Sequence, residues 1–432
     1  MTSDHSGPAS RGRLRRVALP AFALAVIARI VWIFAGEHNS NFVDLRVYYE
    51  AAQRVAEGGL YDFALIEYTP QQPLPFTYPP FAALFFFPLR FLPFPAVAVL
   101  WFVLTVGLMF LTVRMCLAIL AAARGEPSRL GDTSLDHTLL WTGAVLWIDP
   151  VRTNLDYGQI NVVIMTIGVW AAYLLARTAS DPSLALRPAR VDGAAGALVG
   201  FVAGIKLTPA VGGLFLLARG RVWAAAFSAA AFGATVAVSY AFLPTETRRY
   251  FTELIGETGP IGAPDKPDNQ ALRGVISRFV GHDVGNGPAW IAAVAVAAAV
   301  LFAAWWVVRR GDVLIALVLV QFLGLLVSPI SWIHHWVWLV PLLIWVVHGP
   351  LGRWGGAGFG APGAAYTPHS TVVAVVLAVI GYIGVHIADK GFRALGVQSG
   401  PVWAFCLAQG AIAAAALAGL ILAHRRELRA VV

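Results

Sequence analysis

Asp44 is the first residue in the chain whose setting suggests chemistry. It lies in the segment VDLRVYYEAAQRVAE. Valine or alanine recurs there every four residues, at Val43, Val47, Ala51 and Val55. This spacing predicts an amphipathic helix whose apolar stripe rests on a membrane surface, with Asp44 and Tyr48 off the stripe and one turn apart. A carboxylate partly withdrawn from water there could act as a general base. The alternative is structural: Asn41 would cap the helix, and Asp44 would favour its dipole.

Lys206 is the second candidate, because it interrupts the apolar run GFVAGIKLTPAVGGLF and is one of only three lysines in the chain. A lysine at membrane depth is costly unless it reaches the interface or meets an anion. Binding of a phosphate is the interpretation that we favour, and simple extension of the side chain to the interface is the alternative.

His334 and His335 follow the turn SPISW. Adjacent side chains on a helix point in different directions, so the pair is not expected to hold one metal ion. One histidine is expected to face a cavity, where it could donate a hydrogen bond to a leaving group or orient a hydroxyl. The other is expected to pack or to bind backbone.

Hydrogen-bonding side chains gather in two further polar stretches, DYGQIN and DNQALRG. Their candidates are Gln159, Asn161, Asn269, Gln270 and Arg273. Together with the hydroxyls of Tyr48 and Tyr78, the amides offer donors and acceptors suited to a sugar. Each amide alone is equally well explained as a turn or helix cap, and their shared side of the membrane is what favours the sugar.

Composition places these residues in a polytopic helical membrane protein. The 432 residues are 58% hydrophobic and 12% charged, with a mean hydropathy of +0.71. Apolar runs long enough to cross a bilayer recur, and helices satisfy their own backbone in lipid. The net charge of +8 comes largely from arginines that flank the helices, so no nucleic-acid partner is expected. Cys116 and Cys406 fall in apolar runs and predict neither a disulfide framework nor a metal cluster.

The arginine clusters predict a topology of about twelve spans with both termini in the cytoplasm. We expect a first helix at 17–36, a catalytic outer loop at 37–78, a short or re-entrant segment at 79–91 and a full span at 95–123. The segments 193–206 and 207–219 are short for full spans. A second long outer loop is expected at 244–287. The five polar stretches described above then all fall on the outer side: VDLRVYYEAA, DYGQIN, GIKLTP, DNQALRG and SPISWIHHW. Their shared side predicts one extracytoplasmic site in a single transmembrane domain, 1–432.

Three kinds of motif are absent from the sequence: there is no Walker A loop, no complete Rossmann dinucleotide-binding fingerprint and no DxD cluster. A metal-dependent enzyme that uses a nucleotide sugar is therefore disfavoured, and no cofactor is predicted. A transporter or lipid flippase fits the span count equally well. It would instead predict polar residues along a path through the bilayer and internal pseudo-symmetry, and neither is evident.

These residues together resemble a known family. VDLRVYYEAA, PLPFTYPPFAALFFFPL, GQIN, GIKLTPAVGGLFLLARG, NQALRGV and SPISWIHHWVWLVPLL are similar to glycosyltransferase family 87, the polyprenol-phosphate-mannose-dependent mannosyltransferases of actinobacteria. The resemblance runs from about residue 42 to 341. Within the family the chain most resembles the α-(1→2)-mannosyltransferases of phosphatidylinositol mannosides and lipomannan.

The resemblance implies an all-α membrane bundle of the GT-C type and a β-linked polyprenyl phosphate mannose donor. It further implies a mannosylated phosphoglycolipid acceptor, inversion at the sugar and an active site on the outer side of the plasma membrane. Asp44 matches the family's catalytic aspartate. Arg46, Lys206 and the two histidines match positions near the donor phosphate, with Arg273 as a further candidate and His335 as the favoured histidine. A transferase of another polyprenyl-linked sugar, such as arabinose, remains the alternative that keeps this mechanism.

Overall fold

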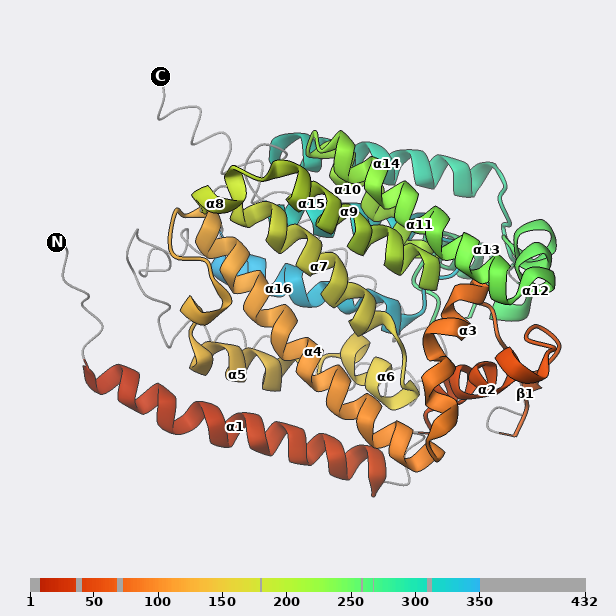
Figure 1. Cartoon of the computed structure of the whole chain (residues 1–432), viewed down its shortest axis with the longest axis horizontal. Helices are drawn as coiled ribbons and strands as arrows, with labels where there is room; N and C mark the ends of the chain where they lie inside the picture. Colours follow the sequence, from red (N-terminus) through yellow and green to blue (C-terminus); the bar gives the residue numbers. More distant parts are fainter. Residues whose placement is uncertain are drawn as a thin grey trace.

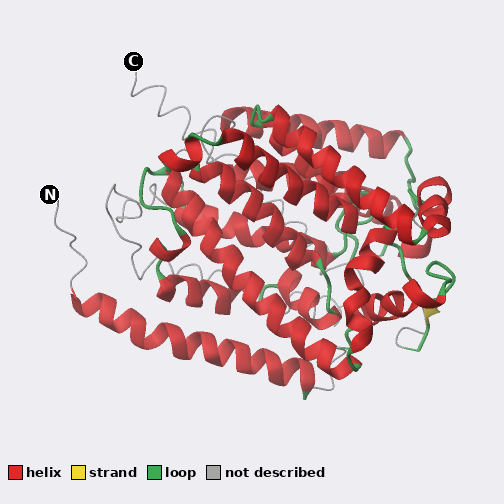
Figure 2. Cartoon of the chain, viewed as in Figure 1, coloured by secondary structure: helices red, strands yellow, loops and turns green. Residues whose placement is uncertain are grey.

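The computed structural model describes residues 8–35, 41–67, 73–178, 181–257, 259–266, 268–308 and 313–349. In this part of the chain nearly all regular structure is helical (Figure 2). One small antiparallel ribbon, β1 (Ala64–Leu65) with β2 (Leu74–Pro75), is the exception. The predicted all-α class is confirmed.

The helices follow one another closely along the chain. The first half contains α1 (Pro8–Phe34), α2 (Val43–Glu57), α3 (Pro80–Phe86), η1 (Phe87–Phe91), α4 (Phe94–Ala123), η2 (Leu130–Asp132), α5 (Leu135–Val145), α6 (Asp149–Tyr157), α7 (Asn161–Arg177), α8 (Pro182–Ala185) and α9 (Pro188–Ile205). The second half contains η3 (Thr208–Val211), α10 (Gly212–Ala218), α11 (Val222–Phe242), α12 (Pro244–Arg249), η4 (Tyr250–Leu254), η5 (Gly259–Ile261), α13 (Leu272–Val280), α14 (Pro288–Val308), α15 (Val313–Val327), η6 (Ile333–Trp338) and α16 (Leu339–His348).

Three helical stretches in the described ranges are long and apolar enough to cross a membrane: Arg16–Phe34, Phe94–Ala123 and Val222–Phe242. Several apolar helices are shorter, including the Pro80–Phe91 segment that the sequence predicted to be short or re-entrant. The predicted spans beyond residue 349 lie outside the described residues. A membrane protein is therefore supported, and the count of about twelve spans stays a prediction.

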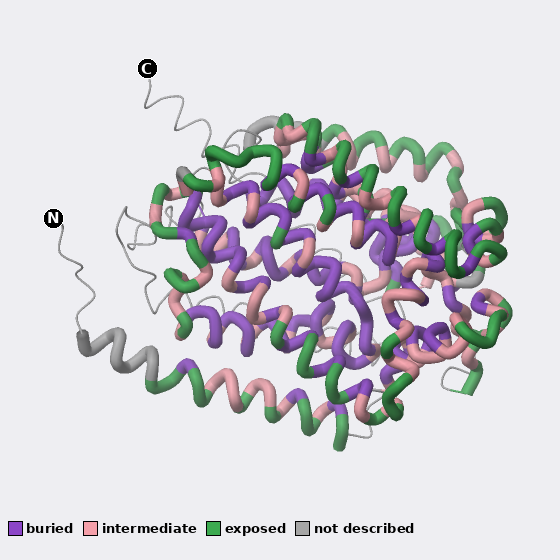
Figure 3. The backbone as a smooth tube through the Cα atoms, in the orientation of Figure 1, coloured by how far each residue is buried: buried purple, intermediate pink, exposed green. Residues whose placement is uncertain are grey.

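The best buried helices lie in the middle of the bundle, and the exposed ones lie at its edges (Figure 3). α7 is buried along most of its length, whereas α1 runs along the lower edge of Figure 1 and α14 along the upper edge. α9 packs very closely on α11. A Cβ added at Gly196 or Gly200 would lie 2.1 Å from the carbonyl oxygen of Ala224 or Ser228. Small residues four apart allow this approach between helix backbones.

The segments predicted to be outer loops gather at one end of the bundle, on the right of Figure 1. They include α2, β1, α12 and α13, and α3, from the segment predicted to be short or re-entrant, lies beside them. The stretches DNQALRG and SPISW meet directly there, because Asn269 bridges to Trp332 and the amide of Gln270 donates to the carbonyl of Ser331 at 2.8 Å. Segments distant in sequence thus form one polar end.

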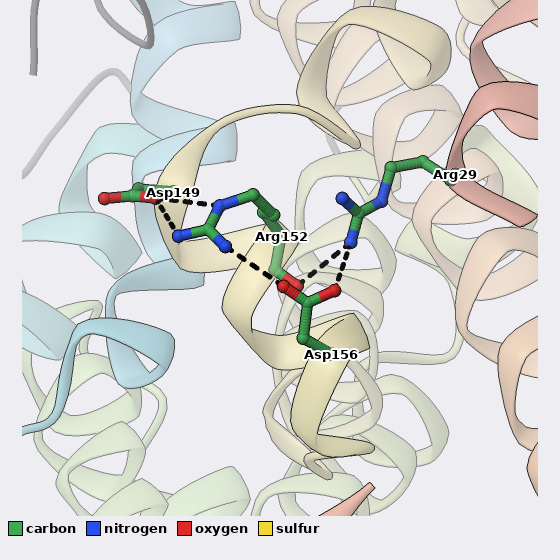
Figure 4. Close-up of polar contacts among 4 residues, drawn as sticks. All are labelled: Arg29, Asp149, Arg152 and Asp156. Atoms are coloured by element: carbon green, nitrogen blue, oxygen red, sulfur yellow. Dashed lines mark hydrogen bonds and ion pairs between the residues drawn. The ribbon is translucent and has the colours of Figure 1, made fainter. Parts of the chain in front are cut away.

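A chain of ion pairs joins the first helix to this end (Figure 4). Arg29, fully buried on α1, donates to Asp156 on α6 at 2.6 Å. Arg152 donates to the other oxygen of Asp156 at 3.1 Å and to Asp149 at 2.7 Å. Asp156 thus fixes the last turn of α6, which leads directly into the DYGQIN stretch.

Replacing Asp156 by alanine should strongly destabilise the protein. The change leaves the buried guanidinium of Arg29 without the carboxylate that neutralises it, and breaking a buried pair in this way costs about 3–5 kcal/mol. Arg249→Ala is the matched control, because it removes a partly exposed pair with Asp62 and should cost at most about 1 kcal/mol. Chemical unfolding of the two variants in detergent measures the difference; equal losses would contradict a structural role for the buried pair.

Candidate active site

Asp44 lies in the first turn of α2, which begins at Val43. The N-cap position belongs to Phe42, whose φ of 51° is left-handed, so the prediction of Asn41 as N-cap is wrong by one residue. Asn41 still accepts a hydrogen bond from the amide of Val43 at 3.3 Å. The amide of Phe42 donates to the carbonyl of Asp156 at 3.2 Å, which ties the start of α2 to α6.

The buried face of α2 is broader than the predicted stripe. Tyr48 was expected among the polar residues, yet it is fully buried, with its ring stacked on Phe86 at a centroid distance of 4.3 Å. Leu45 is buried against Gly158, where an added Cβ would lie 2.6 Å from the Leu45 Cβ. Gly158 also has a φ of +68°, so both its conformation and the space around it favour glycine. The turn after α6 therefore packs directly on α2.

The side-chain amide of Gln159 lies at the centre of the site. Its Oε1 accepts hydrogen bonds from the hydroxyl of Tyr48 at 3.0 Å, from that of Tyr78 at 3.4 Å and from Nδ2 of Asn161 at 3.3 Å. Three donors on the oxygen orient the amide so that its NH₂ group donates to the carboxylate of Asp44. Asp44 and Tyr48 thus share a side of the helix, as predicted, through a common partner.

Lys206 follows the last residue of α9 and meets the same group of side chains. Its Nζ donates to Oδ1 of Asn161 at 3.0 Å and lies 3.2 Å from Nε2 of His335. It also lies 5.2 Å from the centroid of the Tyr78 ring, a cation–π contact. Asn161 completes the connection by donating to the carbonyl of His334 at 3.1 Å. The structure therefore brings Asp44, Lys206 and the histidine pair together.

The electrostatics of Asp44 suit a proton acceptor. Burial raises the pKa of its carboxyl to about 6, while the hydrogen bond from Gln159 and the positive charge of Lys206 act in the opposite direction. The group is consequently ionised at neutral pH but more basic than an ordinary aspartate.

The two histidines differ in their surroundings. His335 is partly accessible and contacts Lys206 through Nε2. His334 is buried, with its ring 5.7 Å from that of Tyr157, and its Nε2 has no hydrogen-bond partner within the described ranges. This arrangement favours His335 as the histidine that faces the site.

Other predicted site residues lie in different surroundings. Arg46 stacks over Phe94 at 4.0 Å and donates to the carbonyl of Asn41 at 2.9 Å. Arg273 forms a two-pronged ion pair with Asp283 at 2.9 and 2.6 Å and holds the pKa of that carboxyl at about 2. These contacts connect neither arginine to Lys206.

Asn269 is saturated by backbone partners. Its Nδ2 donates to the carbonyls of Pro264 and Pro329, and its Oδ1 accepts from the amides of Ala271 and Ser331. This side chain holds two loops together and has little capacity left for a sugar. Gln270, also buried, bonds the same turn through its backbone.

With this geometry in place, the comparisons with known proteins identify the family. A family model described as glycosyltransferase family 87 matches residues 76–329. The chain belongs to this family. The matched range contains Gln159, Asn161 and Lys206, whereas Asp44 precedes it and His335 follows it.

Relatives within the family carry closely related names. The chain is 42% identical over 339 residues to the "polyprenol-phosphate-mannose-dependent alpha-(1-2)-phosphatidylinositol pentamannoside mannosyltransferase" of Mycobacterium tuberculosis (strain CDC 1551 / Oshkosh), covering 78% of this chain and 74% of that protein. It is 40% identical to the protein of the same name from Mycolicibacterium smegmatis, covering 82% and 81%. A "phosphatidylinositol mannoside mannosyltransferase" of M. tuberculosis (strain ATCC 25618 / H37Rv) is 32% identical, over 73% and 72%. No solved structure matches the chain.

A pocket beside Lys206 contains residues of this family 87 enzyme that the sequence analysis missed. Asn161 and His335 line it together with Thr208 and Gln321. Gln321 is the one polar residue of α15, VLIALVLVQFLGLLV, and it is buried. That isolated amide in an apolar run was the available signal. Among the described residues, no group of three His, Cys, Asp or Glu side chains could hold a metal ion.

Asp44→Asn is expected to make folding less sensitive to pH. Because folding raises the pKa of Asp44 from 3.8 to about 6, the folded state binds more protons than the unfolded state between these values. Wild-type stability should therefore fall as pH rises through this window, by at most about 3 kcal/mol and by less where solvent screens the half-buried group. Asparagine removes this cost.

Thermal unfolding in detergent at several pH values measures this effect. Glu50→Gln is the control, because Glu50 lies on the same helix in a half-exposed pair with Arg54. Its profile should follow that of the wild type. If Asp44→Asn follows the wild type as well, the raised pKa is refuted.

Proposed function

We propose that this enzyme transfers mannose from polyprenyl phosphate mannose to a phosphatidylinositol mannoside and forms an α-(1→2) linkage at the extracytoplasmic face of the plasma membrane. One observation carries the proposal: a half-buried carboxylate of raised pKa shares a network with a lysine and a histidine, in a family 87 chain. The relatives described above are named for this donor, this linkage and acceptors of this class. Those names favour mannose over arabinose and a transferase over a transporter.

Each partner in the reaction has a group suited to it. Asp44 accepts the proton of the acceptor's 2-hydroxyl as that oxygen forms its bond to the anomeric carbon. The bond between the anomeric carbon and the phosphate oxygen breaks, and the polyprenyl phosphate leaves with the electron pair. Lys206 and His335 lie together where they can meet the charge of the phosphate. A single displacement on a β-linked donor gives the α product.

Other residues named by the sequence have supporting places in this proposal. Tyr78 is partly accessible and contacts both Gln159 and Lys206, so it is the favoured residue for a sugar contact. Arg46 and Arg273 would reach the phosphate only after exchanging their present partners. The proposal requires no metal ion, because fixed cations can meet the charge of a monophosphate.

Asp44→Asn should lower kcat by about 10²–10⁴-fold, since the amide cannot accept the proton. The assay measures transfer of radiolabelled mannose from polyprenyl phosphate mannose to phosphatidylinositol mannosides in membranes. In the wild type, kcat/KM should fall below about pH 6 as Asp44 becomes protonated. Glu50→Gln should retain near-normal turnover. Turnover of Asp44→Asn equal to that of the wild type would exclude Asp44 as the base.

Lys206→Met should impair use of the donor, because it removes the cation that meets the phosphate. The expected loss in kcat/KM for the donor is about 10²–10³-fold, as for the removal of one charge-stabilising group. The KM for the acceptor should change little. Lys266→Met, in the loop before α13, is the matched control. Equal effects of Lys206→Met on donor and acceptor would argue against a phosphate role.

A further inference from the structure

The polar residues of the site fall into two groups by their accessibility. Asp44, Tyr78, Lys206 and His335 each keep part of their surface accessible. Gln159 and Asn161 are only 4% and 6% exposed, and Tyr48 is fully buried. A substrate can reach the first group directly. The two amides expose far less surface, although Asn161 also lines the pocket beside Lys206.

Three hydrogen bonds of the buried amides form a chain that runs in one direction, from Lys206 to Asp44. Lys206 donates to Oδ1 of Asn161, Nδ2 of Asn161 donates to Oε1 of Gln159, and the NH₂ of Gln159 donates to Asp44. Within this chain each donor lies on the side of the lysine and each acceptor on the side of the carboxylate. Such aligned dipoles stabilise the positive charge at one end and the negative charge at the other.

Little bonding capacity remains on these amides for a sugar. Both N–H groups of Asn161 are used, one by Gln159 and one by the carbonyl of His334. The oxygen of Gln159 accepts from three donors. A hydroxyl could therefore bond the N–H groups of Asn161 or the oxygen of Gln159 only by displacing or crowding a buried partner.

We propose that Gln159 and Asn161 form a buried amide relay, which positions Asp44 and Lys206 and contacts neither sugar nor phosphate. The relay holds the base and the phosphate-binding cation in one network while keeping them from forming a direct ion pair. This inference rests on the proposed function, since it assigns positioning residues to that reaction.

The charged and titratable groups around Asp44 come from several elements. They are Tyr48 on α2, Tyr78 before α3, Tyr157 on α6 and Lys206 after α9. Gln159 lies among them as the neutral donor to the carboxylate. Substitution of Gln159 therefore changes one contact of Asp44 and leaves these charges in place.

The test compares Gln159→Leu and Gln159→Glu with the wild type. Leucine removes the hydrogen bond to Asp44, which should move the acidic limb of kcat/KM upward by about one pH unit. Glutamate keeps the acceptor oxygen but faces Asp44 with a second carboxylate, which should move the limb further. In both variants kcat should fall about tenfold or more, as when a residue that orients an active-site group is lost. The KM values for donor and acceptor should stay near the wild-type values.

Asn154→Ala is the matched structural control. Asn154 is fully buried, and its Nδ2 donates to the main-chain carbonyl of Gln159 at 3.1 Å. Its loss loosens the same turn without removing a member of the relay. This variant should unfold more easily and leave the acidic limb in place. Unfolding measurements on all variants identify any that fail to fold.

The possible outcomes are distinct. A raised acceptor KM with an unmoved limb would overturn the relay and make Gln159 a sugar ligand. A shift of the acidic limb of kcat/KM in Asn154→Ala as large as in the Gln159 variants would also overturn the relay. If the wild type transfers no mannose, the proposed function fails. The relay is then decided by infrared titration of Asp44, with Asp44→Asn as the blank. Titration near pH 6 in the wild type and higher in both Gln159 variants supports the relay; identical titrations refute it.

Discussion

The site depends on keeping a carboxylate and an ammonium group together at a partly dehydrated position. Removing each charge from water is costly, and the cost is recovered only where polar partners are fixed in place. Gln159 and Asn161 supply these partners between Asp44 and Lys206. The two charges come from positions 162 residues apart in sequence, so the packing of α2, α6, α7 and α9 has to be accurate before any of these bonds can form.

Two features of the fold provide that accuracy. Gly158 lets the turn after α6 lie directly on Leu45, and the pair between Asp156 and Arg29 anchors the same turn to the first helix. On the opposite side, the close contact of α9 with α11 through Gly196 and Gly200 fixes the helix that ends at Lys206. Apolar packing alone specifies such positions poorly in a membrane. Polar anchors and close backbone contacts specify them better.

Asp44, Lys206 and the histidine pair could be predicted from sequence because each is a costly polar residue in an apolar or amphipathic setting. Their convergence followed from the predicted sidedness of the loops. The roles of the amides could not be predicted, because the side of the membrane on which a loop lies does not reveal the hydrogen-bond partners of its side chains. Asn269 and Gln159 are both amides in polar stretches of the sequence, yet Asn269 is saturated by backbone partners and Gln159 contacts Asp44. Tyr48 was misplaced for a related reason, since the helical period does not reveal that Phe86 covers a second face.

The amides also explain how the carboxylate stays reactive beside a cation. A direct ion pair with Lys206 would lower the pKa of Asp44 and make it a weaker base. With Gln159 as its hydrogen-bonding partner, the effect of burial exceeds that of the lysine, and the pKa remains raised. The lysine in turn keeps one side directed to His335 and to the accessible surface. In the proposed reaction, the same separation that preserves the basicity of one group leaves the other able to meet an anion, so the proposed relay would support both ends of the transfer.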